Sequence, residues 1–111
     1  MAGIDRLILE RARRAVIALS DEALVVESYV FGSHLTGEPD VWSDIDIAAF
    51  LDGAESWDIE RRANVSARIQ RVVGDDIEIH LFPSSSIDSP VAGSFATYVR
   101  RTGLRIEVPE A

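Results

Sequence analysis

The sequence predicts an α/β (α+β) domain in which a small mixed β-sheet is flanked by helices. Segments with apolar residues at helical spacing alternate along the chain with Val- and Ile-rich segments of strand length, a pattern typical of this class. The chain has 111 residues, of which 47% are hydrophobic, enough for one core. We therefore expect a single domain over residues 1–111, with elements in the order α-β-β-α-β-α-β.

The first half of the chain contains one predicted helix and two predicted strands. Residues 4–19 carry apolar residues at every third or fourth position, which predicts a helix, and Asp5 near its start suits the helix dipole. Residues 24–31 are rich in Val and aromatic residues and predict a strand that ends at Gly32-Ser33. Residues 43–51 predict the second strand. The arginines of this first helix are expected on a solvated face.

The next predicted pair is a second helix and a third strand. Ser56 or Asp58 can cap a helix that ends at Gly74, since glycine is favoured just past a helix C-terminus. The arginines of this helix are expected to face outward. Residues 76–82 then alternate between polar and apolar side chains, which predicts a strand with Glu78 and His80 on one face and isoleucines on the other.

The last predicted elements are a helix and a short strand. Residues 90–102 predict a helix that stops at Gly103, and residues 104–108 predict the strand. Four side chains of the helix are expected to face inward: Val91, Phe95, Tyr98 and Val99.

Composition excludes several classes of site. Cysteine is absent, which excludes disulfides, thiolate metal sites and cysteine nucleophiles. All 11 basic residues are arginine, so a P-loop lysine and a Schiff-base lysine are excluded too. A net charge of −8 makes direct DNA binding unfavourable, because phosphate contacts dominate that affinity. Residues 4–19 are too charged for a signal peptide or a membrane span, so we expect a cytoplasmic protein without a membrane partner.

Two aspartates in the second predicted strand are the clearest candidates for chemistry. Asp is depleted in strands, yet Asp44 and Asp46 stand one residue apart in an apolar run. On a strand both would leave from the same face, with Cα atoms about 6.5–7 Å apart. Carboxylates at that separation can hold two metal ions for phosphoryl or nucleotidyl displacement. A solvent-facing strand with two polar positions is the alternative.

Three further features bear on this hypothesis. Gly32-Ser33 follows a strand, so its backbone amides and hydroxyl can face an anion, although an ordinary turn would look the same. Glu78 becomes a third acid, as metal ligand or general base, if its strand lies beside the Asp44–Asp46 strand; otherwise it faces water. His80 shares the face of Glu78, and His34 follows Ser33. Either histidine can touch the site or simply be partly exposed, and their roles stay open.

The motif as a whole resembles a known family. Phe31-Gly32-Ser33, Gly37 and Ser43-Asp44-Ile45-Asp46-Ile47 are similar to the signature of the DNA polymerase β superfamily of nucleotidyltransferases, in particular the minimal nucleotidyltransferases. By position, the resemblance implies that Gly32, Ser33 and Ser43 bind the nucleotide. It also implies that Asp44, Asp46 and Glu78 bind metal and act in catalysis. Family members often carry an arginine shortly after the serine, where this chain has His34-Leu35-Thr36.

The resemblance also implies an activity and a partner. The expected activity is Mg²⁺-dependent transfer of AMP from ATP to an acceptor, with two ions. Many minimal members are antitoxins paired with a helical HEPN-type toxin, and some transfer AMP to that toxin, so such a partner is implied here. Two alternatives remain: transfer to a small-molecule acceptor such as an aminoglycoside, and a catalytically inactive module that docks a basic partner. The acceptor, the base preference and any homo-oligomer are not determined by the sequence.

Overall fold

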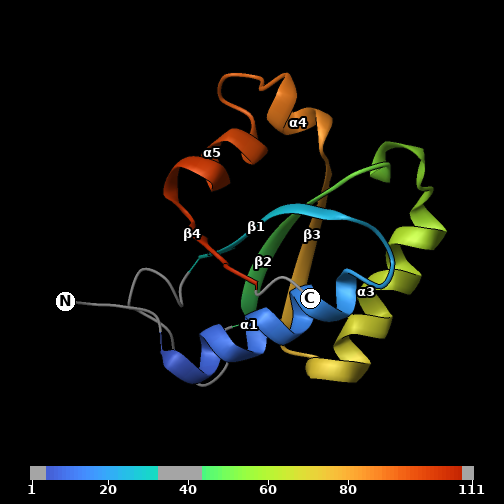
Figure 1. Ribbon diagram of the computed structural model, residues 1–111, viewed down its shortest axis with the longest axis vertical. Helices are drawn as coiled ribbons and strands as arrows, with labels where there is room; N and C mark the ends of the chain where they lie inside the picture. Colours follow the sequence, from blue (N-terminus) through green and yellow to red (C-terminus); the bar gives the residue numbers. More distant parts are fainter. Residues whose placement is uncertain (1–4, 33–43, 109–111) are drawn as a thin grey trace.

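The computed structural model describes residues 5–32 and 44–108. Helices and strands alternate much as predicted (Figure 1). The helices are α1 (Arg6–Leu19), η1 (Ala54–Ser56, a 3-10 turn), α3 (Ile59–Val73), α4 (Ser85–Asp88) and α5 (Phe95–Thr102). The strands are β1 (Val25–Phe31), β2 (Ile45–Leu51), β3 (Ile77–Pro83) and β4 (Leu104–Arg105).

The strands of the described residues form one mixed sheet in the order β3-β2-β1-β4. β1 pairs antiparallel with both β2 and β4. β2 and β3 are parallel, and α3 makes the crossover between them, as parallel neighbours require. The predicted α/β (α+β) class with a small mixed sheet is therefore confirmed.

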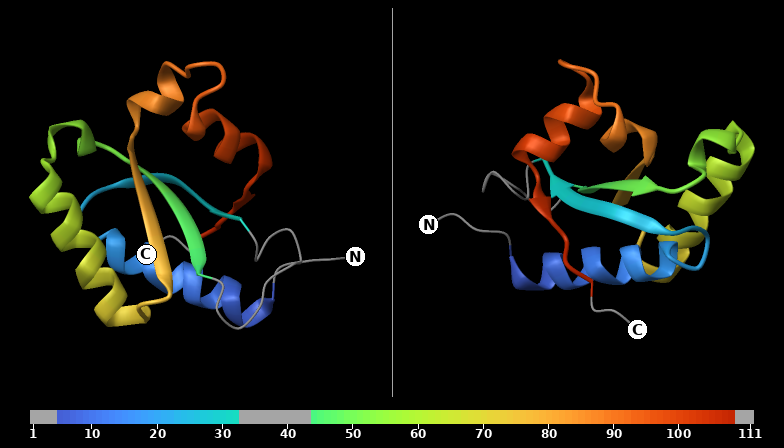
Figure 2. Two further views of the ribbon diagram at one scale, coloured as in Figure 1. Left: turned by 180° about the vertical axis from the view of Figure 1, so that it is seen from behind. Right: turned by 45° about the horizontal axis from the view of Figure 1, so that its top comes forward.

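Helices cover both faces of this sheet, as the two views of Figure 2 show. α1 and α3 lie on one face, where Val16, Ile45, Ile47 and Ile69 belong to one buried apolar cluster. α5 lies on the other face, over a second cluster that is largely aromatic. Alternation along β1, β2 and β3 separates the two sets of side chains, so these three strands contribute to both layers.

Local capping explains where the longer helices begin and end. The Asp5 side chain accepts a hydrogen bond from the Leu7 amide at the start of α1. Asp58 does the same for the Arg61 amide at the start of α3, so of the two predicted caps Asp58 is the one used. Gly74 follows the last residue of α3 at φ 140°, as predicted. These contacts satisfy helix-end amides and carbonyls that have no partner within the helix.

The segment over residues 90–102, predicted as one helix, differs from that prediction. The helix begins only at Phe95, with Ser94 as its cap, because Gly93 has a φ of 78°, which lies outside right-handed helical geometry. A short helix, α4, precedes it and was not predicted. Val99 is buried as expected, but Phe95 and Tyr98 are half exposed and Val91 is exposed. The final strand pairs over two residues, Leu104–Arg105.

Several arginines expected in solvent instead join elements, and Arg62 and Arg11 are two of them. Arg62 on α3 donates to the carbonyls of Ala54 at 2.9 Å and Leu81 at 3.1 Å, so it ties the β2–α3 connection to β3. Arg11 on α1 pairs with Asp76 just before β3. Each guanidinium group is bound by oxygen atoms of other elements, which fixes the positions of these elements relative to one another.

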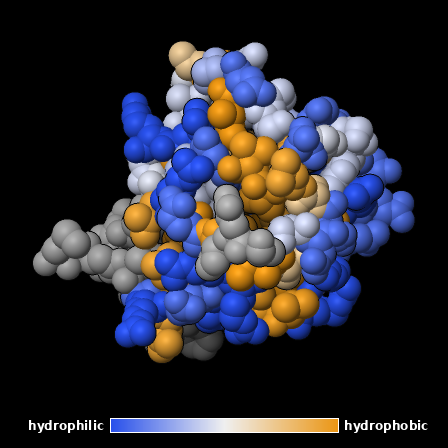
Figure 3. Space-filling model, viewed as in Figure 1, coloured by the Kyte–Doolittle hydropathy of each residue, from blue (hydrophilic) through white to orange (hydrophobic). Residues whose placement is uncertain are grey.

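The surface seen in Figure 3 is mainly hydrophilic, with hydrophobic side chains gathered towards the middle of that face. None of the helices in the described ranges is long and apolar enough to cross a membrane.

Candidate active site

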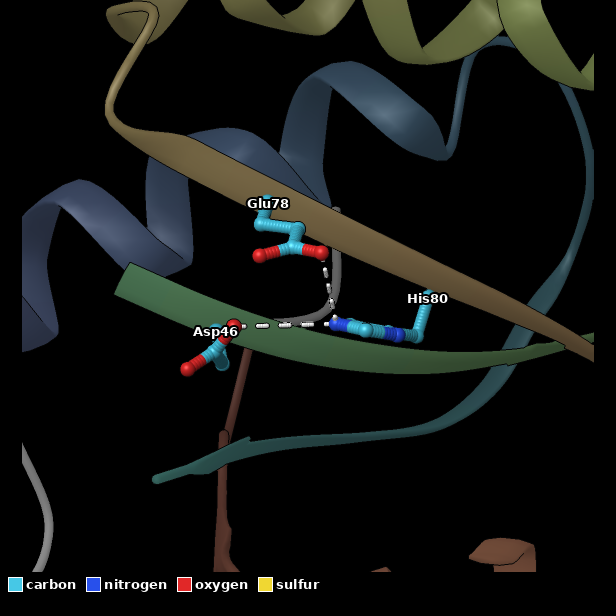
Figure 4. Close-up of side chains that lie close together, drawn as sticks. All are labelled: Asp46, Glu78 and His80. Carbon is cyan, nitrogen blue, oxygen red and sulfur yellow. Dashed lines mark ion pairs between the residues drawn. The ribbon is translucent and has the colours of Figure 1, made fainter. Parts of the chain in front are cut away.

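Three polar side chains meet on the α5-facing side of the sheet: Asp46 from β2 and Glu78 and His80 from β3 (Figure 4). Asp46 and Glu78 are direct partners in the parallel β2–β3 register. The His80 Nε2 atom lies 3.6 Å from Asp46 Oδ1 and 3.6 Å from Glu78 Oε1. One ligand atom from each of the three residues lies within 4.8 Å of the others.

The position of this cluster follows from the strand period. Ile45, Ile47 and Ile77 are fully buried against α1 and α3. Side chains alternate along a strand, so the intervening Asp46 and Glu78 must point to the opposite face. The parallel register then places the two carboxylates side by side.

The end of β1 closes one side of the cluster. Phe31 is the register partner of Asp46, and Gly32 follows with a φ of 84°. A Cβ atom at position 32 would lie 2.5 Å from Asp46 Oδ2. The Asp46 carboxylate therefore packs directly against the backbone at Gly32, at a distance that only glycine allows.

The electrostatics of the cluster favour a cation. Burial raises the pKa of Asp46 above its ordinary value, and the negative charge of Glu78 raises it further, while His80 opposes the change. Glu78 is the more exposed carboxylate, with 55% of its side chain accessible against 23% for Asp46. A divalent ion between the two carboxylates would remove this repulsion.

The donor set fits a divalent metal. It offers two carboxylates, and the Nε2 atom of His80 is buried without a hydrogen-bond partner in the described residues. Buried polar atoms without partners are rare, and an imidazole nitrogen aimed at two carboxylates is a usual metal ligand. Asp46, Glu78 and His80 are the residues that could hold such an ion.

Comparison with known proteins identifies the fold family. Residues 9–101 match the family model described as "Nucleotidyltransferase domain". The chain belongs to this nucleotidyltransferase family. No curated protein matches the sequence significantly.

Solved structures similar to this nucleotidyltransferase support the same fold. A protein from Sulfolobus solfataricus described as a nucleotidyltransferase is 23% identical, with a TM-score of 0.57 over 73% of this chain and 71% of its own. A toxin–antitoxin structure with AMP-PNP is 20% identical, with a TM-score of 0.56 over 88% of this chain and 74% of its own. The toxin–antitoxin MntA-HepT is 18% identical, with a TM-score of 0.51 over 90% and 73%.

The nucleotidyltransferase structure brings together some of the predicted site residues. Asp46, Glu78 and Gly32 meet as described above. Asp44 is exposed and directly precedes β2, and it is not a member of the three-residue cluster. The predictions for Ser33 and Ser43, and the open question of His34, concern positions outside the described residues.

His80 is the residue whose part the sequence left open. The structure places it between the two carboxylates, and the alternating pattern of residues 76–82 was the signal that put it on the face of Glu78. Aromatic rings hold the imidazole: its centroid lies 5.1 Å from that of Phe31 and 5.7 Å from that of Phe95, both edge-on. Phe95 in turn stacks on Tyr98, with centroids 6.4 Å apart, so the aromatic row reaches the surface.

Proposed function

We propose that this nucleotidyltransferase moves AMP from ATP to a partner protein in a Mg²⁺-dependent reaction, and that it acts as the antitoxin of a toxin–antitoxin pair. The observation that carries the proposal is the packing of Asp46 and Glu78 side by side, with Asp46 against Gly32 of the Gly-Ser turn. The closeness of Gly32 to Asp46 supports the proposal that the triphosphate and the metal bind side by side.

The predicted site residues have three tasks in the proposed reaction: binding the metal, positioning the triphosphate and taking up the proton of the acceptor. Asp46 and Glu78 hold Mg²⁺, with Asp44 as a further ligand, and Gly32, Ser33 and Ser43 position the triphosphate. Bound Mg²⁺ supplies positive charge that offsets the charge developing on the phosphates. An acceptor hydroxyl oxygen bonds to the α-phosphorus while the bond to the leaving pyrophosphate breaks. Glu78 is the more exposed carboxylate, so it is the one positioned to take the hydroxyl proton.

The proposal of a protein acceptor rests on the solved structures that share this fold. Two structures with this fold are toxin–antitoxin complexes, and one contains AMP-PNP. A helical HEPN-type toxin is therefore the partner we propose.

The direct test is transfer of label. The protein is incubated with the product of its neighbouring gene, Mg²⁺ and ATP labelled at the α-phosphate. We expect label on the partner protein, none when the label is on the γ-phosphate, and none with Asp46→Asn or Glu78→Gln. Glu55→Gln is a matched control, because Glu55 is exposed on η1 and is not part of the three-residue cluster.

The outcomes separate the candidate functions. Equal labelling by the wild type and Asp46→Asn would refute catalysis by this site. Labelling of an aminoglycoside, but not of the partner protein, would replace the protein acceptor with a small molecule. Tight binding of the partner without any transfer would identify an inactive docking module.

A further inference from the structure

His80 belongs to the three-residue cluster, but the proposed reaction gives it no role. Its Nε2 atom is equidistant, at 3.6 Å, from one oxygen of Asp46 and one of Glu78. These distances are too long for good hydrogen bonds, and Nε2 is buried with no hydrogen-bond partner in the described part of the chain. The nitrogen therefore lies at ion-pair distance from both carboxylates without a normal hydrogen bond to either.

We propose that His80 is a third protein ligand of the metal site and that its nitrogen gives the site an affinity for transition metals such as Zn²⁺, beside the Mg²⁺ that its carboxylates bind. The inference rests on the proposed function only in placing a divalent ion at Asp46 and Glu78. It adds a ligand, and an affinity for transition metals, that a site built from carboxylates alone would not have.

The geometry suits one ion bound by all three side chains. Ligands about 2.1 Å from a metal lie about 3.0 Å apart in neighbouring octahedral positions and about 3.4 Å apart in a tetrahedron. The 3.6 Å separations of His80 Nε2 from the two carboxylates need a contraction of about 0.2 Å for a tetrahedron and about 0.6 Å for an octahedron. All three ligand atoms lie within 4.8 Å of one another, so rotations of the Asp46 and Glu78 side chains would bring the carboxylate oxygens to bonding distance of the same ion.

The surroundings of His80 fix the direction of its ring. Phe31 and Phe95 contact the imidazole edge-on, at centroid distances of 5.1 and 5.7 Å. α5, which carries Phe95, is itself anchored to β1, because Arg100 donates to Glu27 at 3.0 and 3.3 Å. A ring held in this way keeps Nε2 aimed at the carboxylates, and a pre-aimed ligand loses little freedom when a metal binds.

The chemistry of the donor set determines this affinity. Mg²⁺ favours oxygen ligands and loses its water reluctantly, whereas imidazole suits Zn²⁺, Fe²⁺, Ni²⁺ and Cu²⁺. One imidazole with two carboxylates is therefore better suited to Zn²⁺ and the other transition metals than two carboxylates alone. The composition makes the test clean, since the chain has 2 histidines and no cysteine to compete for Zn²⁺.

The experiment measures binding without turnover. Tag-free, chelator-treated protein without nucleotide is titrated with ZnCl₂ and, separately, with MgCl₂ by calorimetry. We expect His80→Gln to weaken Zn²⁺ binding roughly 10- to 100-fold, the range seen when supporting metal-site residues are removed, with a smaller change for Mg²⁺. Glu55→Gln, which changes an exposed residue outside the cluster, is the control and should bind Zn²⁺ like the wild type.

Two further measurements keep the test independent of folding. Nitrogen-15 spectra of labelled histidine should show Zn²⁺ shifting the Nε2 resonance of His80. His80→Asp, which replaces the nitrogen with oxygen, should lower the affinity for Zn²⁺ and raise that for Mg²⁺. Zn²⁺ affinity equal in the wild type and His80→Gln, or no Zn²⁺ binding by the wild type, would overturn the proposal. If the wild type binds Zn²⁺ through His80 but transfers no label to the partner protein, only the proposed function is rejected.

Discussion

Gly32 provides the sharpest test of how the turn and the acidic site are linked. Gly32→Ala places a methyl group on a residue with a φ of 84°, 2.5 Å from Asp46 Oδ2. The left-handed conformation costs a non-glycine residue about 1–2 kcal/mol. The clash adds little to this cost, because the end of the Asp46 side chain can move aside. That movement displaces the carboxylate from its position between Gly32 at the end of β1 and Glu78 on β3.

The chain contains a matched control for the backbone strain. Gly53 has a φ of 83°, and a Cβ atom there would meet nothing within 4 Å. Gly53→Ala therefore carries the conformational cost without the clash. We expect both variants to lose about 1–2 kcal/mol of unfolding free energy, partly offset by the reduced freedom of the unfolded chain.

Function should separate the two variants. Displacement of a catalytic group by about 1 Å costs on the order of 100-fold in rate, so Gly32→Ala should lose about that much label transfer while Gly53→Ala stays close to the wild type. Urea unfolding measures the stability, and transfer of the α-phosphate label measures the activity. Wild-type activity in Gly32→Ala would refute the view that this glycine positions Asp46.

Three other predictions concern the charged groups. Asp46→Asn should raise the unfolding free energy at pH 7 in metal-free buffer, because burial and Glu78 raise the pKa of Asp46 and so disfavour its charged form; unchanged urea midpoints would contradict this. Burial alone would raise the pKa of Glu27, but hydrogen bonds from Arg100 and Tyr29 hold it below its ordinary value. The charged Glu27 therefore stabilises the folded state above pH about 4.3, and this stabilisation is lost as the pH falls through the lower folded-state pKa. Glu27→Gln should remove this acid-sensitive stabilisation and cost about 1–3 kcal/mol of unfolding free energy at pH 7. Identical curves of stability against pH for the variant and the wild type would count against this prediction. Arg62→Met should cost about 1–3 kcal/mol, because it leaves carbonyls of the β2–α3 connection unpaired. Arg61→Met removes only a contact over the Trp57 ring and should cost about 1 kcal/mol or less; equal losses in thermal melts would refute the difference.

Local sequence signals predicted most elements because local interactions form them. The cap at Asp58 and the stop at Gly74 involve groups within one helical turn, so their residues can be recognised in the sequence. The exception is the segment before α5. There Gly93 takes a left-handed conformation, and nothing in the apolar spacing of residues 90–102 indicates that the backbone leaves the helix at this point.

The site was predictable only in part. The spacing of Gly32-Ser33 from Asp44 and Asp46 predicted the motif, and the alternation of residues 76–82 put Glu78 and His80 on one face. The sequence did not determine that β3 would lie parallel and next to β2, which is what brings Glu78 beside Asp46. Strand pairing depends on which arrangement buries the apolar faces of α1, α3 and the sheet together.

The sequence by itself therefore determined most of the helices and strands and the acidic residues available for chemistry. The tertiary structure decided which acids meet, why position 32 must be glycine, and that His80 lies between the two carboxylates. The physical reason is one of range. Periodicity and capping act over a few neighbouring residues, whereas the three-residue site exists only where distant strands pair and aromatic side chains from β1 and α5 close around the imidazole.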